Sequence, residues 1–146
     1  MACPFFVPTQ RWDGGAWPHP SRLPLGAGWL GCCSAPGHEG VEPAEEEQRE
    51  FCNLGYAAKC PRLPVERSCD AVRFSVVRQE GAFLLVCFIC EAGHLPAAHG
   101  NLRYDSLAGK WVSAHADPRI QRLAECFVQS YLSRTNRSAP LETICE

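Results

Sequence analysis

The sequence lacks any long apolar run and any excess of basic residues. Its longest apolar run covers only residues 82–90, which is far shorter than the roughly 20 residues of a membrane-spanning helix. The formal net charge is -2, so no electrostatic footprint for nucleic acid or anionic lipid is present. Residues 1–17 have no basic start and no apolar core, so we expect no secretory signal. We therefore expect a cytoplasmic protein that binds neither nucleic acid nor a membrane.

Familiar catalytic motifs are also missing. The chain contains no Gly-rich phosphate loop, no G-x-S-x-G nucleophile elbow and no H-E-x-x-H zinc motif. His94, His99 and His115 can be read as a second metal or acid/base site, but loop histidines near prolines are more typical of the surface. Because no acid/base or nucleophile set is visible, the sequence favours a protein that is not an enzyme.

Length and composition are those of one globular domain. The chain has 146 residues, of which 46% are hydrophobic and 21% are charged. A domain of this size buries roughly 68% of its unfolded surface, which is enough for a hydrophobic core. We predict a single domain over residues 1–146, with a cysteine-rich, metal-binding arm and helix in residues 1–64 and a sheet with a C-terminal helix in residues 70–134.

The first half is predicted to hold an arm, one helix and a connector. Residues 1–40 are rich in proline and glycine, so we expect them to be irregular. Their large aromatic side chains favour burial, and we expect a metal centre to pin the arm to the domain. Residues 42–58 are predicted to be helical, because Pro43 suits the first helical position and glutamates follow in the first turn. A connector follows over residues 61–70.

The second half is predicted to form strands and then a helix. Val72, Phe74 and Val76 alternate with polar residues, which predicts a strand. Residues 82–90 form a continuous apolar run typical of a buried strand, and the turn at 79–81 joins the two as a hairpin. Later we expect a loop with His94, Pro96 and His99, short strands around residues 102–104 and 111–112, a helix over 118–134 and a frayed tail over 135–146.

These elements define the expected fold class. It is α+β, with a cysteine-bearing N-terminal arm and helix and a small antiparallel sheet of three or four strands packed by a C-terminal helix.

Cysteine is abundant, and its positions indicate metal ligation. The chain holds ten cysteines, and cytosolic thiols stay reduced, so a disulfide framework is less favoured than metal ligands, reactive thiols or buried core thiols. Cys3 and Cys60 each precede a proline, and Cys52 lies on the predicted helix. The doublet Cys32-Cys33 adds one more thiol, because adjacent residues of an extended segment point opposite ways. We predict that these four segments bind one metal centre.

The spacing favours an iron–sulfur cluster over zinc. Structural zinc sites usually draw ligands in tight C-x(2–4)-C pairs, and none of these four cysteines forms one. A [4Fe–4S] cluster is wider and takes one cysteine per iron, so it tolerates ligands from separate segments. Aromatic residues can shield such a cluster from water, and the nearby candidates are Phe5, Phe6, Trp29 and Tyr56. Zinc, and ordinary buried thiols without any metal, remain the alternatives.

The other cysteines are predicted to be spectators. Cys87 and Cys90 have C-x-x-C spacing, but they lie in an apolar strand and face opposite sides, which is typical of core thiols. Cys126 is predicted on the polar side of the last helix, where a thiol is open to oxidation. Cys69 and Cys145 have no distinguishing context.

A run of motifs resembles a family of small cysteine-rich bacterial proteins of the acidobacterial type. The matching segments are Cys3-Pro4-Phe5-Phe6, residues 22–26 (Arg-Leu-Pro-Leu-Gly), Gly31-Cys32-Cys33, residues 52–57 (Cys-Asn-Leu-Gly-Tyr-Ala) and Cys60-Pro61. The resemblance spans most of the chain. It implies no activity, but it favours Cys33 over Cys32 and supports treating Cys3, Cys33, Cys52 and Cys60 as one set.

Two functions follow from these expectations. The first is an iron–sulfur protein of the [4Fe–4S] type that acts in electron transfer or redox sensing with a protein partner. The second is a zinc-stapled, non-catalytic interaction module in which the metal only stabilises the fold.

Overall fold

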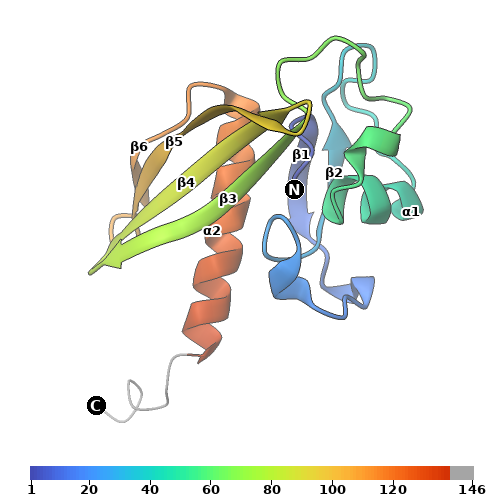
Figure 1. The fold of residues 1–146 in the computed structure, drawn as a ribbon. Helices are drawn as coiled ribbons and strands as arrows, with labels where there is room; N and C mark the ends of the chain where they lie inside the picture. Colours follow the sequence, from blue (N-terminus) through green and yellow to red (C-terminus); the bar gives the residue numbers. More distant parts are fainter. Residues whose placement is uncertain (139–146) are drawn as a thin grey trace.

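A four-stranded antiparallel sheet with one helix across its face forms the larger part of the fold (Figure 1). The computed structural model describes the backbone of residues 1–138 and the side chains of residues 1–135. The strand order is β3-β4-β5-β6, and the strands are β3 (Ala71–Glu80), β4 (Phe83–Ala92), β5 (Leu95–Asp105) and β6 (Lys110–Ser113). Helix α2 (Pro118–Ser138) follows. The predicted α+β class, with a small antiparallel sheet and a C-terminal helix, is confirmed.

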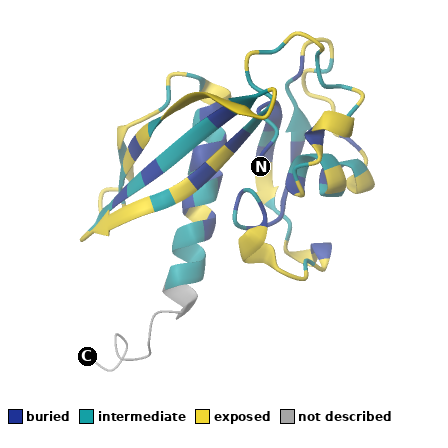
Figure 2. Ribbon diagram, viewed as in Figure 1, coloured by how far each residue is buried: buried dark blue, intermediate teal, exposed yellow. Residues whose placement is uncertain are grey.

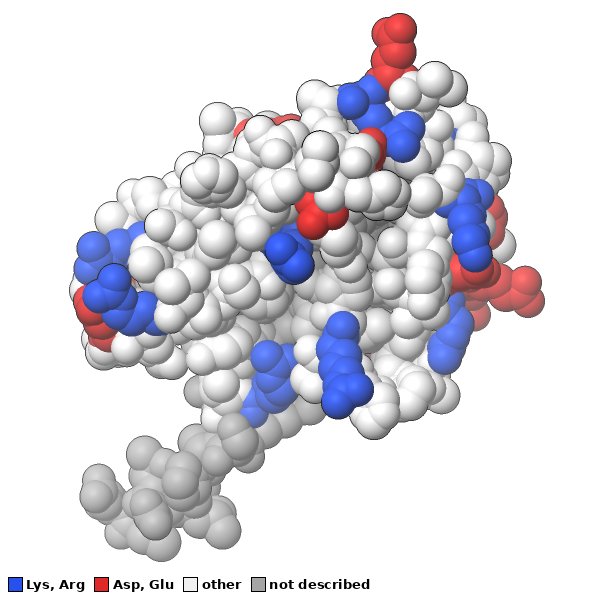
Figure 3. Space-filling view, viewed as in Figure 1, with Lys and Arg blue, Asp and Glu red and all other residues white. Residues whose placement is uncertain are grey.

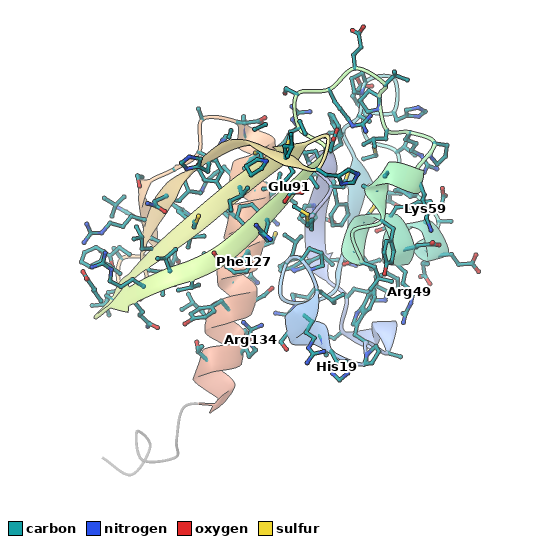
Figure 4. The ribbon with its side chains drawn as sticks, in the orientation of Figure 1. His19, Arg49, Lys59, Glu91, Phe127 and Arg134 are labelled. Carbon is teal, nitrogen blue, oxygen red and sulfur yellow. The ribbon has the colours of Figure 1, made fainter. Side chains whose placement is uncertain are left out.

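The core lies between α2 and the inner face of the sheet. Alternate residues of β3 and β4 are buried there, as the dark segments of Figure 2 show. Phe127 faces the sheet from α2 (Figure 4), and its ring centre lies 5.7 Å from that of Phe74. Leu84 of β4 and Leu123 of α2 are both fully buried. The alternating apolar side chains of the strands and the apolar stripe of the helix therefore pack together in one layer.

The arm is not wholly irregular, contrary to the prediction. β1 (Phe6–Arg11) pairs antiparallel with β2 (Trp29–Cys33), and the register shifts between Pro8 and Gln10. A bulge of this kind accommodates a proline, which has no N–H to donate to the ladder. Gly31 permits the close pairing, because a Cβ atom there would lie 2.0 Å from the carbonyl oxygen of Val7.

The predicted helix over residues 42–58 is instead broken into three short pieces. An α-helical turn, α1 (Glu45–Glu47), continues into a π-helical segment, η3 (Gln48–Asn53), and a 3-10 turn, η4 (Ala57–Lys59), follows. The break falls at Gly55, whose φ is 89°. A side chain is disfavoured there by this left-handed backbone, and a Cβ atom would also lie 2.2 Å from the carbonyl oxygen of Met1.

Three further expectations need correction. The predicted loop with His94, Pro96 and His99 is mostly strand, because β5 already begins at Leu95 and pairs with the whole of β4. Cys126 is fully buried in the core rather than exposed on the polar side of α2. Helix α2 also continues past residue 134 to Ser138. The remainder of the predicted tail, including Cys145, lies outside the described residues.

One hydrophobic core joins the arm to the sheet. It includes Phe6 and Trp29 from the arm together with residues of β3, β4 and α2. Ala2 forms an isolated bridge with Val72, with N···O distances of 2.7 and 2.8 Å. The indole N–H of Trp29 donates to the hydroxyl of Ser130 on α2 at 3.3 Å. Among residues 1–138, no helix has the length and apolar character needed to cross a lipid bilayer.

Truncating a central core side chain should destabilise the protein strongly. For Leu84→Ala we expect a loss of about 2–5 kcal/mol in the free energy of unfolding, because a buried leucine leaves a cavity. Leu95 is 70% exposed, so Leu95→Ala is the matched control and should change stability by less than about 0.5 kcal/mol. Chemical denaturation of the two variants measures the difference, and equal losses would contradict this description of the core.

Candidate metal centre

Four thiols from four separate segments line one small cavity beneath η3. Cys3, Cys33, Cys52 and Cys60 all border it. The thiols also interact electrostatically: Cys52 is coupled to the other three, and Cys3 to Cys33 and Cys60. Every cysteine among the described residues is free of disulfide bonds. The structure therefore brings together the four cysteines named from the sequence, whereas Cys32 does not border the cavity.

Both cysteine–proline steps open the same kind of turn. The N–H of Phe6 donates to the carbonyl of Cys3 at 3.2 Å, and the N–H of Leu63 donates to the carbonyl of Cys60 at 3.2 Å. Proline follows the cysteine in each turn, where its fixed φ favours the bend and where no donor is lost. The two turns carry the first and the last of the four cysteines, Cys3 and Cys60, to the same cavity.

Backbone N–H groups point at two of the sulfur atoms. The thiol of Cys3 accepts hydrogen bonds from the N–H groups of Phe5 and Phe6. The Sγ atom of Cys33 accepts one from the N–H of Ala35 at 3.3 Å. Hydrogen bonds of this kind stabilise negative charge on sulfur and tune the reduction potential of iron–sulfur centres.

The Cys33 segment is attached directly to the Cys3 turn. Phe6 pairs with Cys33 in the β1–β2 ladder. Beyond the end of β2, Ser34 donates to the carbonyl of Phe5 through both its N–H, at 2.7 Å, and its hydroxyl, at 2.8 Å. Strand pairing and this double contact thus fix the distance between two of the candidate ligands. Because side chains alternate along a strand, Cys32 points away from them.

Two buried side-chain amides dock the Cys52 segment onto β2. Asn53 accepts the N–H of Trp29 at 2.7 Å and donates to the carbonyls of Trp29, at 2.9 Å, and Gln48, at 2.8 Å. Gln48 accepts the N–H of Gly31 at 3.0 Å and donates to the carbonyl of Pro43 at 2.8 Å. These amides stand five residues apart, so the wide π-helical turn aims both at the same strand. Cys52, between them, is thereby held over the cavity.

Burial sets the protonation of the two innermost thiols. It raises the pKa of Cys3 to about 11, against the opposing effect of the backbone hydrogen bonds. Burial, followed by the neighbouring thiols, also raises the pKa of Cys52. Both groups are therefore neutral thiols at pH 7 in the metal-free protein, and metal binding would have to displace their protons.

An ion pair supplies charge at the rim. Arg62 donates to both carboxylate oxygens of Glu47, at 2.9 and 3.2 Å. Glu47 in turn raises the pKa of the guanidinium, and a further hydrogen bond from Arg62 reaches the thiol of Cys60. The positive charge of Arg62 lowers the pKa of Cys52 in opposition to burial. Arg62 is thus the cation placed to offset negative charge on the sulfur atoms.

The cavity walls are apolar, although not formed by all the predicted residues. Phe6 borders the cavity as expected, and Phe51 does so without having been singled out. Phe5 lies on the other side of the Cys3 turn, where it borders a different cleft. Trp29 is in the core, and Tyr56 is 54% exposed, so neither shields the thiols.

The candidate ligands at this cavity are all thiols. Thiolates suit zinc and iron–sulfur clusters. Among the residues that the structure describes, however, no group of three or more His, Cys, Asp or Glu side chains is arranged to hold one metal ion. The four cysteines border one cavity whose remaining lining is mostly apolar.

The three histidines considered as a second site do not form one. His115 packs edge-on against Phe88, with ring centres 4.6 Å apart, and its Nδ1 accepts the N–H of Asp117 at 2.9 Å. His94 lies in the β4–β5 turn with a φ of 64°, and His99 is exposed in β5. The two cysteines of the C-x-x-C spacing differ in exposure: Cys90 is buried, whereas Cys87 is half-buried.

Comparisons with known proteins give no relatives. No protein-family model matches the chain, and no match was found among curated proteins or solved structures.

Removing the Asn53 amide should loosen the site. Asn53→Ala leaves the N–H and carbonyl of Trp29 without their partners, so we expect a loss of about 1–3 kcal/mol in the free energy of unfolding. The matched control is Asn101→Ala, because Asn101 is exposed on β5 and should contribute less than about 0.5 kcal/mol. Urea unfolding of both variants measures this. If Asn53→Ala unfolds with the control, the amide contact does not hold the segment.

Proposed function

We propose that this protein binds a [4Fe–4S] cluster through Cys3, Cys33, Cys52 and Cys60. The observation that carries the proposal is the convergence of four thiols, distant in sequence, on one apolar cavity. When bound, such a cluster supplies one-electron redox chemistry. We propose a role in electron transfer or redox sensing with a protein partner in the cytoplasm, where reduced thiols are available for ligation.

The residues around the sulfur atoms support this assignment. The N–H groups of Phe5, Phe6 and Ala35 would remain as donors to ligated sulfur. Phe6 and Phe51 would exclude water, and Arg62 would offset part of the negative charge. Each of these features acts on the reduction potential of an iron–sulfur centre. Membership of the acidobacterial-type family is likewise a proposal, carried by the cysteine motifs alone.

Anaerobic purification tests the cluster directly. We expect brown protein with about four iron and four sulfide per chain, one iron for each cysteine ligand. Cys60→Ser and Cys33→Ser should each lose most of this content. The neighbouring Cys32→Ser is the matched control and should retain it, since Cys32 does not border the cavity. Elemental analysis joined to an absorption spectrum measures all three variants.

Other results of that experiment would change the proposal. Colourless protein with about one zinc per chain would favour the zinc-stapled module instead. Protein whose metal content and folding survive Cys60→Ser would exclude both metal hypotheses. Equal losses from Cys32→Ser and Cys33→Ser would show that the doublet acts through the fold rather than through one ligand.

The charge of Arg62 should affect the reduction potential. Arg62→Gln removes a cation beside Cys60 and leaves Glu47 without its ion pair. Both changes disfavour the more negative, reduced cluster, so the potential should fall. Arg103→Gln is the control, because Arg103 lies at the far tip of the sheet beside Phe83. Potentiometric titration decides, and an unchanged or higher potential in Arg62→Gln would refute this role.

A further inference from the structure

A second cleft lies on the other side of the turn that carries Cys3. It has a volume of about 610 Å³, and Pro4 and Phe5 form part of its wall while Cys3 faces the metal cavity. The other walls come from the 61–70 connector, from β4 and β5, and from the start of α2. Figure 1 shows the connector arching above β1 and β2 before it enters β3 at one end of the sheet.

Two thiols line this cleft. Cys69 belongs to the connector and Cys90 to β4, and both line the cleft. The thiol of Cys69 lies within hydrogen-bonding reach of the thiol of Cys90. These are distinct from the four thiols of the metal cavity, none of which lines the cleft.

The backbone around Cys69 is held firmly against β4. The N–H of Asp70 donates to the carbonyl of Glu91 at 2.7 Å, and the carboxylate of Asp70 accepts the N–H of Gly93 at 2.7 Å. On the partner side, Cys90 pairs with Val72 in the β3–β4 ladder. Glu91, labelled in Figure 4, marks the end of β4 where this attachment occurs. The connector that carries Cys69 is therefore attached to the same end of β4 that carries Cys90.

The cleft carries charges of both signs. Arg67 and Arg119 contribute cations, and Glu66 and Asp117 contribute carboxylates. The guanidinium of Arg119 lies 5.0 Å from the centre of the Phe5 ring. Arg119 pairs with Asp117, and Arg67 pairs with Asp70. A small peptide with amino and carboxylate groups would bind this surface by exchanging partners with these ion pairs.

We propose that Cys69 and Cys90 form a second redox site, which closes to a disulfide by exchange with a small peptide disulfide of the glutathione type. The thiolate of Cys69 attacks one sulfur of the peptide disulfide and releases the first peptide thiol. The thiolate of Cys90 then attacks the Cys69 sulfur and releases the second. The protein loses two electrons and two protons, and the disulfide is reduced to two thiols.

Burial makes this exchange slow. Burial, followed by the hydrogen bond with Cys90, raises the pKa of Cys69 to about 12. Only a small thiolate fraction is present at neutral pH, so the pair resists brief exposure and responds to a sustained oxidising poise. The site does not depend on the metal centre, since it uses neither its ligands nor its cavity.

Peptide mapping after oxidation tests the proposal. The full-length protein, purified without oxygen, is incubated with oxidised glutathione over several hours, alkylated and digested. We expect a disulfide that joins the Cys69 peptide to the Cys90 peptide and the release of about two glutathione thiols for each disulfide formed. The thermal midpoint should rise on oxidation, because the new bond closes a loop. Cys87→Ser, on the same strand, is the control and should behave as the parent protein.

Variants separate this site from the metal centre. Cys69→Ser should abolish the linked peptide and the rise in thermal midpoint, and Cys90→Ser should do the same if it folds. Cys60→Ser should lose metal and still form the linked peptide. The proposal is overturned if Cys69 and Cys90 are both alkylated after oxidation, or if either is found joined to a different cysteine. Loss of the linked peptide in Cys60→Ser would also overturn its independence.

Discussion

The contact on which the arrangement of thiols depends is made by two amide side chains, those of Gln48 and Asn53. They hydrogen-bond to backbone groups of β2 that a third strand would otherwise have to pair with. The polar backbone groups at the edge of this two-stranded sheet are therefore satisfied by side chains. Buried amides are demanding, because each must find all its partners to offset the loss of water. Once satisfied, they allow only one position for the segment that bears Cys52, and the other thiols are set by turns and strand pairing around it.

The surroundings of the four sulfur atoms oppose negative charge in some respects and favour it in others. Burial among apolar side chains holds the innermost thiols in their neutral form. Backbone N–H groups and the guanidinium of Arg62 act in the opposite sense. Because the thiolate is the reactive form, the raised pKa values keep Cys3 and Cys52 poorly reactive toward oxidants. The visible surface in Figure 3 carries acidic and basic side chains in separate small groups, so local charge, rather than an extended field, governs the thiols.

The sequence was sufficient for regions in which one periodicity dominates. The strands around Val72 and Val86 and the helix through Leu123 follow from their patterns, and the fold class follows from those elements. Three features required long-range contacts that no local pattern encodes. The pairing of β1 with β2 depends on Gly31, the π-helical turn on the docking of Asn53, and the burial of Cys126 on the position of the sheet. The four candidate ligands were found because proline marked two of them, whereas Arg62 and Phe51 had no comparable signal in the sequence.

The peptide from Cys3 to Phe6 serves as a partition one chain thick. Cys3 and Phe6 form the wall of one chamber, and Pro4 and Phe5 form the wall of the other. Proline stiffens this partition, and Ser34 anchors its far side. The two chambers are therefore separated by a single thickness of backbone, although they share no lining residue.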